Sequence, residues 1–403
     1  MSFLGCSVKL IKDRPLLQKL KNIFYHLPQA FIANILYGFP SNGMTIVGVT
    51  GTDGKTTTTN LIYKILKDSG KKVSMISTIN AVIGGKTYDT GFHVTSPDPF
   101  TLQKFIRNAK NSGDNYLALE VTSHALDQYR FWGINFTVGV ITNITHEHLD
   151  YHQTFENYFK TKLKLIKYAK WRVVNENLKG DWGDRGSKGN GVVTFGSSGP
   201  KLNLKLIGDY NLENAYASLA VAKVLGIDAE SAQRSVEGFT GIPGRMEEVK
   251  NNRGIKIFVD FAHTPNALKQ ALKALRPKAY GRLIVVFGAA SERDILKRPI
   301  MGEIAAKEAD MTILTDEDPR HEDRNKILNE IAGGAMMAGA KDGINLFKEP
   351  DRAKAIKLAI TLAKKGDIIG IFGKGHEKSI NYRGVETPWS DFEAVKKALT
   401  NRH

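Results

Sequence analysis

The sequence predicts an α/β fold, because strand-like apolar runs and helical patterns alternate along most of the chain. A turn-rich Gly-Ile-Pro-Gly passage at 241–244 interrupts this alternation, which then restarts. With 403 residues, the chain is long enough for two or three domains, each with its own core. We therefore expect a short helical N-terminal segment over 1–43, a central domain over 44–242 and a C-terminal domain over 243–403.

Short β-branched or apolar runs give the predicted strands, and periodic apolar residues give the helices. In the central domain the strands are predicted at 45–49, 72–76, 116–121, 136–142 and 172–174, and the helices at 55–69, 100–111, 154–169 and 212–225. In the C-terminal domain the strands are predicted at 255–260, 282–287, 311–315 and 367–372, and the helices at 267–275, 297–309, 325–333 and 351–364. The stretch 179–200, rich in glycine, serine and charge, is predicted to form exposed loops or a small subdomain. Both sheets should be mostly parallel, and the second domain should be Rossmann-like.

A glycine-rich loop lies between the first strand and the first helix of the central domain. Its residues are Gly51, Thr52, Asp53, Gly54, Lys55, Thr56 and Thr57. The two glycines allow backbone N–H groups to converge on an anion at a helix N-terminus. Lys55 can reach the terminal phosphates of a nucleotide, and the hydroxyl of Thr56 can bind magnesium. Because Val49 stands where the strict phosphate-loop motif has glycine, this is a shortened variant, and a glycine turn without a ligand is the alternative.

Polar residues also follow two other predicted strands. Glu120 ends one strand, at the edge where parallel sheets place their ligands, and a carboxylate beside a phosphate loop suits magnesium. The segment 142–152 contains three histidines and two carboxylates. This composition predicts metal or substrate contact, although a solvated polar loop would look the same.

The overall composition narrows the class of protein. A hydrophobic fraction of 42% and a charged fraction of 24% are typical of globular proteins. The single cysteine, Cys6, excludes an internal disulfide framework and a cysteine-rich zinc site, and it suits a reducing compartment, so we expect a cytoplasmic protein. The net charge of +16 favours an anionic partner. We expect no nucleic-acid partner, because the sequence has no platform of interleaved aromatic and basic residues.

Apolar residues at helical spacing and several basic residues precede the first strand. The basic residues are Lys9, Lys12, Arg14, Lys19 and Lys21. A helix that lies weakly on a membrane surface through residues 1–40 would have this pattern. A helix packed on the next domain would have it too, and we favour that alternative.

Six motifs, in order along the chain, resemble the Mur ligase family. They begin at Gly51, Glu120, Glu147, Gly244, Asp260 and Gly373. The likeness extends from about residue 45 to the C-terminus, and it is greatest to members that add the third residue of the peptidoglycan stem peptide. Typical members also carry a uridine-nucleotide-binding domain before the first strand, and here only the short segment 1–43 precedes it.

The resemblance implies an ADP-forming ligase that activates a carboxylate as an acyl phosphate and joins it to an amine. The expected partners are ATP, a UDP-MurNAc-L-Ala-D-Glu-like acceptor and a diamino acid, with meso-diaminopimelate favoured over lysine. The implied cofactors are ATP and two Mg²⁺ ions, and the protein is expected to be a monomer. Two alternatives stay open: the same chemistry on a lipid-linked, polyglutamate or storage-peptide acceptor, and a basic nucleotide-binding protein without ligase activity.

The resemblance also implies roles for individual residues. The expected catalytic residues are Lys55, Glu120, His148, Lys162 and Arg245. The expected metal ligands are Thr56, Glu120, His148 and Lys162, the last as a carbamate because an ammonium group cannot bind a cation. An ordinary surface lysine is the alternative for Lys162.

The remaining implied residues bind substrates. Beside the phosphate loop, the nucleotide would contact Asn143, Asn211, Asn214, Arg245 and Asp260. Asn211 and Asn214 could equally cap the helix that begins there. The acceptor would contact Thr95, Ser96, Thr122, Gln128 and Arg130, each of which could also be a turn or surface residue.

The amino acid would be bound in the C-terminal domain. The expected residues are Arg293 or Arg298, together with Glu317, Asp318, Arg320, Gly373 and Glu377. Arg320 suits the distal carboxylate of diaminopimelate. Glu317 and Asp318 replace the aspartate and asparagine of the family's D-N-P-R segment, and we expect the added negative charge to favour an amino group.

Overall fold

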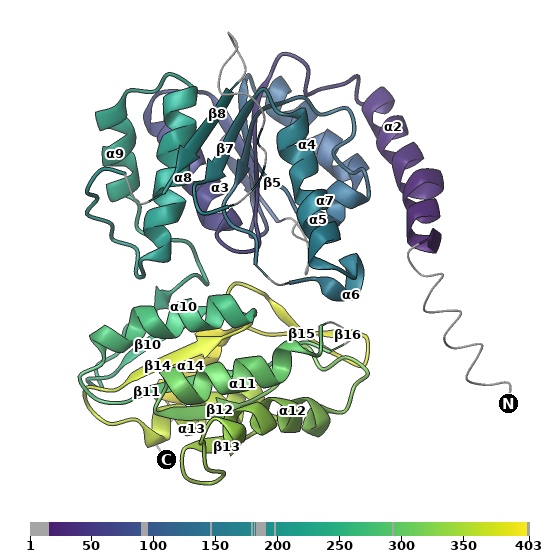
Figure 1. Cartoon of the computed structure of the whole chain (residues 1–403). Coiled ribbons are helices and arrows are strands. Elements are labelled where there is room, and N and C mark those ends of the chain that lie inside the picture. Colours follow the sequence, from purple (N-terminus) through teal and green to yellow (C-terminus); the bar gives the residue numbers. More distant parts are fainter. Residues whose placement is uncertain are drawn as a thin grey trace, which may run out of the picture. The chain divides into compact units, whose positions relative to one another are not determined.

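The computed structural model describes residues 16–89, 96–145, 147–178, 180, 182, 191–196, 199–291 and 294–400 (Figure 1). The chain forms two compact units. The N-terminal unit contains 1–144, 156–200 and 215–236, and the C-terminal unit contains 145–155, 201–214 and 237–403.

The N-terminal unit is built on an eight-stranded sheet with the order β4-β3-β2-β5-β1-β6-β7-β8. Its strands are β1 (Thr45–Thr50), β2 (Val73–Ile76), β3 (Ala81–Ile83), β4 (Lys86–Tyr88), β5 (Tyr116–Glu120), β6 (Phe136–Ile141), β7 (Trp171–Asn175) and β8 (Gly191–Phe195). The pairs from β2 to β8 are parallel, and β3 and β4 extend the sheet as an antiparallel hairpin. The carboxyl ends of β1, β5 and β6 therefore meet at one edge.

Helices cover both faces of this sheet (Figure 1). They are η1 (Asn22–His26), α2 (Leu27–Leu36), α3 (Lys55–Asp68), α4 (Pro99–Asn111), α5 (Ser123–Asp127), α7 (Phe155–Tyr168), α8 (Tyr210–Val224) and α9 (Ala229–Glu237). Apolar residues of α3 and α8 pack against one face, and those of α4, α5 and α7 pack against the other. Because both faces are covered, the central strands are apolar throughout rather than alternating.

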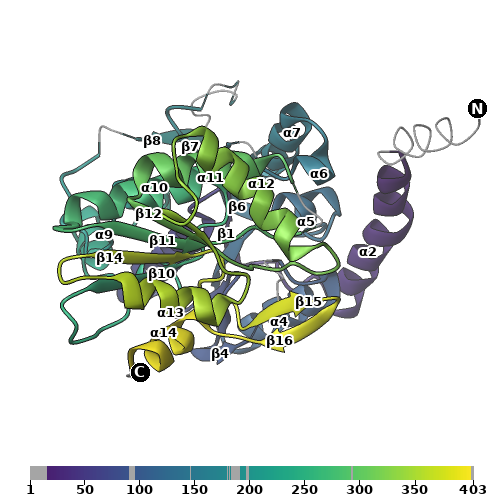
Figure 2. The ribbon, with the colours of Figure 1, turned by 90° about the horizontal axis from the view of Figure 1, so that it is seen from below.

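The C-terminal unit has a six-stranded sheet with the order β13-β12-β11-β14-β10-β9, and only β9 is antiparallel to its neighbour. The strands are β9 (Glu247–Glu248), β10 (Lys256–Asp260), β11 (Leu283–Phe287), β12 (Met311–Leu314), β13 (Leu346–Lys348) and β14 (Ile368–Phe372), with a separate hairpin of β15 (Ser379–Tyr382) and β16 (Val385–Pro388). The helices are α6 (Leu149–His152), α10 (Pro265–Leu275), η2 (Arg276–Lys278), α11 (Lys297–Glu308), α12 (Arg324–Met337), α13 (Arg352–Leu362) and α14 (Asp391–Thr400). The helices α10, α11 and α12 pack on one face of the sheet, and α13 and α14 pack on the other (Figure 2).

The predicted α/β class with mostly parallel sheets is confirmed, and the predicted strands and helices agree with the structure to within a few residues at most ends. The prediction of only loops or a small subdomain over 179–200 is wrong, because β8 forms the edge of the large sheet there by pairing with β7. The strands β3, β4, β9, β13, β15 and β16 and the helices α5, α6, α9, α14 and η2 were not predicted. Among the described helices, none is both long and apolar enough to cross a bilayer.

Candidate active site

The glycine-rich loop connects β1 to α3 at the carboxyl edge of the large sheet. Gly54 precedes α3 with a φ of 81°, in the left-handed region that glycine adopts without strain. A Cβ at Gly51 would collide with the hydroxyl of Thr142, so only glycine fits there. Asn143 fixes the loop, because its backbone oxygen accepts from Thr52 N and its side-chain oxygen from Asp53 N, both at 2.9 Å. The loop is therefore held in shape by the residues that follow β6.

The side chain of Lys55 lies over this loop. Its Nζ donates to the carbonyl oxygens of Gly51 at 3.1 Å and Thr52 at 2.7 Å. A cation and a helix N-terminus thus meet at one point, which is the arrangement that binds phosphate groups. Thr57 follows in the first turn of α3.

Glu120, at the end of β5, lies beside the same helix N-terminus. Thr56 Oγ1 donates to Glu120 Oε1 at 3.1 Å, and the backbone N and hydroxyl of Thr78 donate to the carboxylate at 2.9 and 2.8 Å. Thr56 and Glu120 are both buried. A hydroxyl and a carboxylate are hard oxygen ligands of the kind magnesium prefers, so this pair fits the ion. Thr78 was not identified from the sequence.

Lys162, on α7, contacts the loop from the other side. Its Nζ donates to Gly51 O at 2.6 Å and lies 4.6 Å from the ring centroid of Tyr158. The hydroxyl of Tyr158 is 3.0 Å from Thr52 Oγ1. Lys162 is only 1% exposed, so the surface-lysine interpretation is wrong.

His148, the fourth expected metal ligand, immediately precedes the short helix α6 in the C-terminal unit. Its backbone has a φ of 56°, and its Nδ1 lies 3.9 Å from the carboxylate of Glu147. Within the described part of the chain, no three His, Cys, Asp or Glu side chains form a group that could hold a metal ion. His146 and the side chain of Asp150 fall outside the described residues.

Four of the five predicted acceptor residues form one hydrogen-bonded cluster in the N-terminal unit. The hydroxyls of Ser96 and Thr122 are 3.1 Å apart, and Thr122 also caps α5. Arg130 donates to the backbone oxygen of Ser96 at 2.7 Å, and its Nε and one terminal nitrogen donate to the Gln128 side chain at 2.9 and 2.7 Å. Because Ser96 Oγ also lies 3.5 Å from Glu120 O, this cluster adjoins the strand that carries Glu120. The fifth residue, Thr95, lies outside the described residues.

Besides the loop and Asn143, the predicted nucleotide contacts are Asn211, Asn214, Arg245 and Asp260. The Asn214 amide donates to the Asn211 side-chain oxygen at 3.1 Å, and Asn211 donates to Ile207 O at 2.8 Å. The guanidinium of Arg245 lies 4.7 Å from the ring centroid of Phe261. Asp260 accepts from the backbone N atoms of Met246 and Ala262, each at 2.7 Å. Asp260 therefore fixes both the backbone at Met246 and the turn that follows β10.

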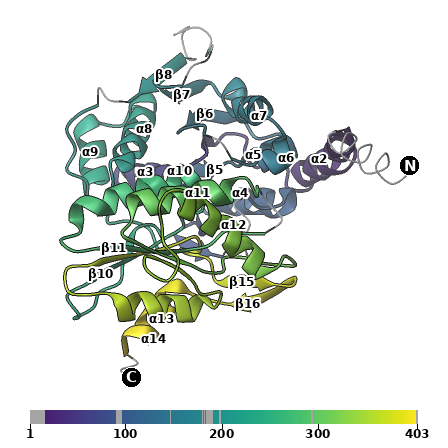
Figure 3. The ribbon, with the colours of Figure 1, turned by 60° about the horizontal axis from the view of Figure 1, so that its bottom comes forward.

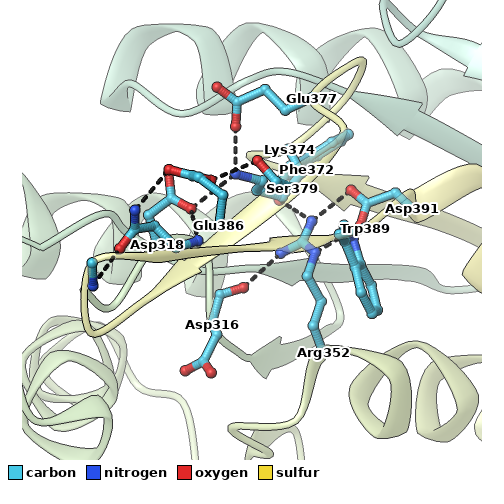
Figure 4. A network of polar contacts seen from close by, with 12 residues as sticks. Asp316, Asp318, Arg352, Phe372, Lys374, Glu377, Ser379, Glu386, Trp389 and Asp391 are labelled. Carbon is cyan, nitrogen blue, oxygen red and sulfur yellow. Dashed lines mark hydrogen bonds and ion pairs between the residues drawn. The ribbon is translucent and has the colours of Figure 1, made fainter. Parts of the chain in front are cut away.

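Two of the predicted amino-acid residues, Asp318 and Glu377, follow the carboxyl ends of β12 and β14 and lie close together (Figure 4). Lys374 is fully buried, and its Nζ lies 3.0 Å from Asp318 Oδ1 and 2.5 Å from Glu377 Oε2. Burial alone would lower the pKa of Lys374, but Glu377 and Asp318 raise it, so the ammonium stays charged. Asp318 is thus paired with a buried ammonium group, and the expectation that negative charge in this region favours an amino group stays a prediction. Lys374 was given no role in the sequence analysis.

Glu317 provides a second buried carboxylate in this region. Burial raises the pKa of Glu317 to about 7, with Lys297 and Lys374 opposing the shift and Asp318 and Glu377 adding to it. Its Oε2 has no hydrogen-bond partner among the described residues. A Cβ at Gly373 would lie 3.1 Å from that oxygen, so glycine leaves the carboxylate room.

A buried arginine, Arg352, links the carboxyl ends of β12 and β14. Arg352 forms a bidentate pair with Asp391, both contacts being 2.7 Å, and neither side chain is exposed. Its other N–H groups donate to Asp316 O at 3.0 Å and Phe372 O at 2.9 Å (Figure 4). Neither Arg352 nor Asp391 was identified from the sequence.

The predicted arginines of this region differ in surroundings. Arg298 is fully buried and donates to Glu322 at 2.8 and 2.7 Å and to Glu330 at 2.6 Å. Burial would lower the pKa of Arg298, but these two carboxylates raise it, so its charge has a structural role. Arg320 is half-buried, has a φ of 45° and donates through its backbone N to Asn381 O at 3.0 Å. Arg293 lies outside the described residues.

Comparisons with known proteins agree with this arrangement. The Mur ligase middle domain matches residues 49–201, and the Mur ligase glutamate ligase domain matches residues 244–375. The UDP-N-acetylmuramoyl-L-alanyl-D-glutamate–2,6-diaminopimelate ligase of Aquifex aeolicus is 37% identical over 393 residues, which is 91% of this chain and 80% of the relative. The UDP-N-acetylmuramyl-tripeptide synthetase of Roseiflexus is 36% identical over 91% of this chain and 81% of the relative.

A solved structure of a UDP-N-acetylmuramoyl-L-alanyl-D-glutamate–2,6-diaminopimelate ligase also has this fold. It is 28% identical, with a TM-score of 0.57, and the match covers 89% of this chain and 78% of the other. Sequence and fold agree over both units, and the chain therefore belongs to the Mur ligase family.

Proposed function

We propose that this protein is an ADP-forming ligase of peptidoglycan precursor synthesis. It would join a diamino acid, with meso-diaminopimelate favoured, to UDP-MurNAc-L-Ala-D-Glu or a close analogue. The observation that carries the proposal is the phosphate loop, where Lys55 covers the loop and Thr56 is hydrogen bonded to Glu120. The names of the two relatives supply the acceptor and the amino acid.

The reaction needs a carboxylate of the acceptor to attack the terminal phosphorus of ATP, which gives an acyl phosphate and ADP. The amine of the diamino acid then attacks the acyl carbon, and inorganic phosphate leaves. No protein nucleophile is required, so the protein must mainly position the substrates and neutralise charge. Lys55 and the N–H groups at the start of α3 are suited to the phosphates.

The family uses ATP and Mg²⁺, and we propose two magnesium sites. Thr56 and Glu120 would hold the first, and Glu120 with His148 and a carbamylated Lys162 would hold the second. Magnesium would neutralise the charge that builds up on the transferred phosphoryl group. The short contact of Lys162 with Gly51 supports its place beside the phosphates.

For the other two substrates we propose separate contacts. The cluster of Ser96, Thr122, Gln128 and Arg130 would bind the acceptor, with Arg130 facing its carboxylates. Arg320 would bind the distal carboxylate of the diamino acid, and Glu317 its amino group. Asn211, Asn214, Arg245 and Asp260 remain the proposed nucleotide contacts from the second half of the chain.

The test is ADP release by the purified chain in a panel of acceptors and amino acids. UDP-MurNAc-L-Ala-D-Glu with meso-diaminopimelate should give the highest kcat/KM, and omission of either should abolish turnover. Lys55→Met removes the phosphate contact and serves as the inactive reference, while Lys64→Met, on the exposed side of α3, is the matched control. Turnover only with lipid-linked, polyglutamate or storage-peptide acceptors would reject the proposed acceptor, and no ADP release with any pair would reject the ligase.

A further inference from the structure

The N-terminal helix (16–36) packs on the N-terminal unit with small and polar residues. Ala30 and Ala33 are fully buried. The side-chain amide of Asn22 donates to Asp127 Oδ2 at 2.7 Å, and that of Asn34 donates to Trp132 O at 2.7 Å. These contacts match the favoured sequence interpretation of a helix packed on the next domain, and they occupy one side of the helix only.

The other side of this helix carries large apolar side chains that contact little. The side chains of Leu16, Leu17, Phe24, Ile32, Ile35 and Leu36 are 53–75% exposed. A hollow of about 310 Å³ beside them is lined by Leu27, Pro28, Phe31 and Trp132. Figures 1 and 3 show α2 at the outer side of the unit. Exposed apolar surface of this extent on a single helix marks an interaction surface.

The charge of the same helix indicates what kind of surface it would bind. Residues 16–36 contain Lys19 and Lys21 and no aspartate or glutamate, and the whole chain has a net charge of +16. The pKa of His26 is lowered mainly by burial, with smaller contributions from the positive charges of Lys21 and Arg130. The aromatic residues Phe24, Tyr25 and Trp132 are at least partly exposed on this side. A helix with an apolar side, basic residues and aromatic rings has the chemistry of a helix that lies in a lipid interface.

We propose that the N-terminal helix (16–36) binds the surface of an anionic lipid membrane. It lies in the interface with Leu17, Phe24 and Ile32 among the acyl chains, and Lys19 and Lys21 contact lipid phosphates. The helix does not cross the bilayer, in keeping with the absence of a spanning helix in the described part of the chain. The protein would thereby bind reversibly to the membrane while its ligase site stays in water.

The experiment is co-sedimentation of the full chain with vesicles at about 0.15 M salt. Vesicles of equal parts phosphatidylglycerol and phosphatidylcholine should pellet the protein at least about 10-fold better than pure phosphatidylcholine vesicles, and the preference should decrease as salt rises. The variant with Phe24→Glu and Ile32→Glu should lose at least about 10-fold in binding, because two charges enter the apolar side. The variant with Lys19→Gln and Lys21→Gln should lose the preference for anionic vesicles.

The matched control places the same two substitutions on exposed residues of the C-terminal unit. Tyr280 and Met337 are 95% and 92% exposed, so Tyr280→Glu with Met337→Glu changes the net charge equally and should leave vesicle binding unchanged. Absence of binding to anionic vesicles, or equal loss in the control, would overturn the proposal. A second result would also overturn it: the wild type forms a dimer in solution and binds no vesicles, and the variant with Phe24→Glu and Ile32→Glu is a monomer. A second copy of the chain would then cover the helix. ADP release without vesicles is measured in parallel, and the vesicle result can be read whether or not the chain is a ligase.

Discussion

The amine of Lys162 donates a 2.6 Å hydrogen bond to the carbonyl oxygen of Gly51, which joins helix α7 to the phosphate loop. The loop glycine and this lysine lie 111 residues apart in the sequence. Lys162 is only 1% exposed, so the contact lies inside the protein. The contact therefore places Lys162 beside the phosphate loop.

We expect Lys162→Met to lower kcat by about 100-fold or more while leaving the fold intact, because methionine keeps the buried volume but not the charge. Lys160, on the same helix, is 66% exposed, and Lys160→Met should retain full activity. The measurement is ADP release, with thermal unfolding as a check on folding. In ¹³C-bicarbonate, the wild type should give a carbamate NMR signal that Lys162→Met lacks, and unchanged kcat in Lys162→Met would exclude the proposed role.

Glu120→Gln should raise the magnesium concentration needed for half-maximal activity by about 10-fold or more. The amide keeps the size of the side chain and can still accept from Thr78, but it carries no negative charge for the ion. A magnesium titration of ADP release gives the answer. Glu230→Gln, at a side chain that is 86% exposed on α9, is the control, and identical magnesium curves for Glu120→Gln and the wild type would disprove the assignment.

Arg320→Ala should lower kcat/KM for meso-diaminopimelate by about 10- to 100-fold, because a charge-assisted pair with the distal carboxylate is lost. Use of lysine, which has no distal carboxylate, should change much less. Arg253, an exposed arginine of the same unit, gives the control Arg253→Ala. Equal losses for both amino acids would show that Arg320 acts on folding or on ATP rather than on specificity.

Arg352→Met should destabilise the protein by about 3–5 kcal/mol, because Asp391 would remain buried without its partner. Adding Asp391→Asn should recover part of that loss, since the unpaired charge is then removed. Denaturant unfolding measures both. Lys396→Met breaks an exposed pair with Glu393 and should cost less than about 1 kcal/mol. A loss for Arg352→Met no larger than that of this surface pair would contradict a structural role.

The raised pKa of Glu317, about 7 against a usual 4.5, predicts a pH dependence of stability. The folded state holds a proton on Glu317 that the unfolded state releases, so this group lowers the unfolding free energy as pH rises from about 4.5 to about 7. Glu317→Gln should remove this slope and make the protein more stable than the wild type at pH 8, by up to about 3 kcal/mol. Unfolding in denaturant across pH 5 to 8 is the measurement, and parallel curves for the two proteins would refute the shift.

Much of the fold could be predicted because both sheets are covered on both faces, so their central strands are short apolar runs that stand out from the helices. The strand β8 was missed because it lies at a sheet edge within glycine-rich sequence, and its pairing with β7 is not visible in the local sequence. The hairpin of β3 and β4 had a signal, Gly84-Gly85 between two short runs, that could have been used.

The site residues also fall into two groups: those marked by a local motif and those that depend on distant contacts. The phosphate loop is local in sequence, and its motif is sufficient to place Lys55 and Thr56 next to an anion site. Lys162, Lys374 and Arg352 are buried, and each contacts a partner far along the chain. Asp318 is 56 residues from Lys374, which also contacts the nearby Glu377, and Asp391 is 39 residues from Arg352. No local pattern marks such pairs. For Lys162 a hint existed, since it shares a side of α7 with the buried Tyr158 and Leu165.

Arg352 contacts the backbone at the ends of both β12 and β14, just where the two segments of the proposed amino-acid pocket begin. Engineering this enzyme to accept a different amino acid would therefore mean exchanging both segments together with the arginine that couples them. A transplanted 316–320 segment alone would meet a mismatched counterpart at 373–377.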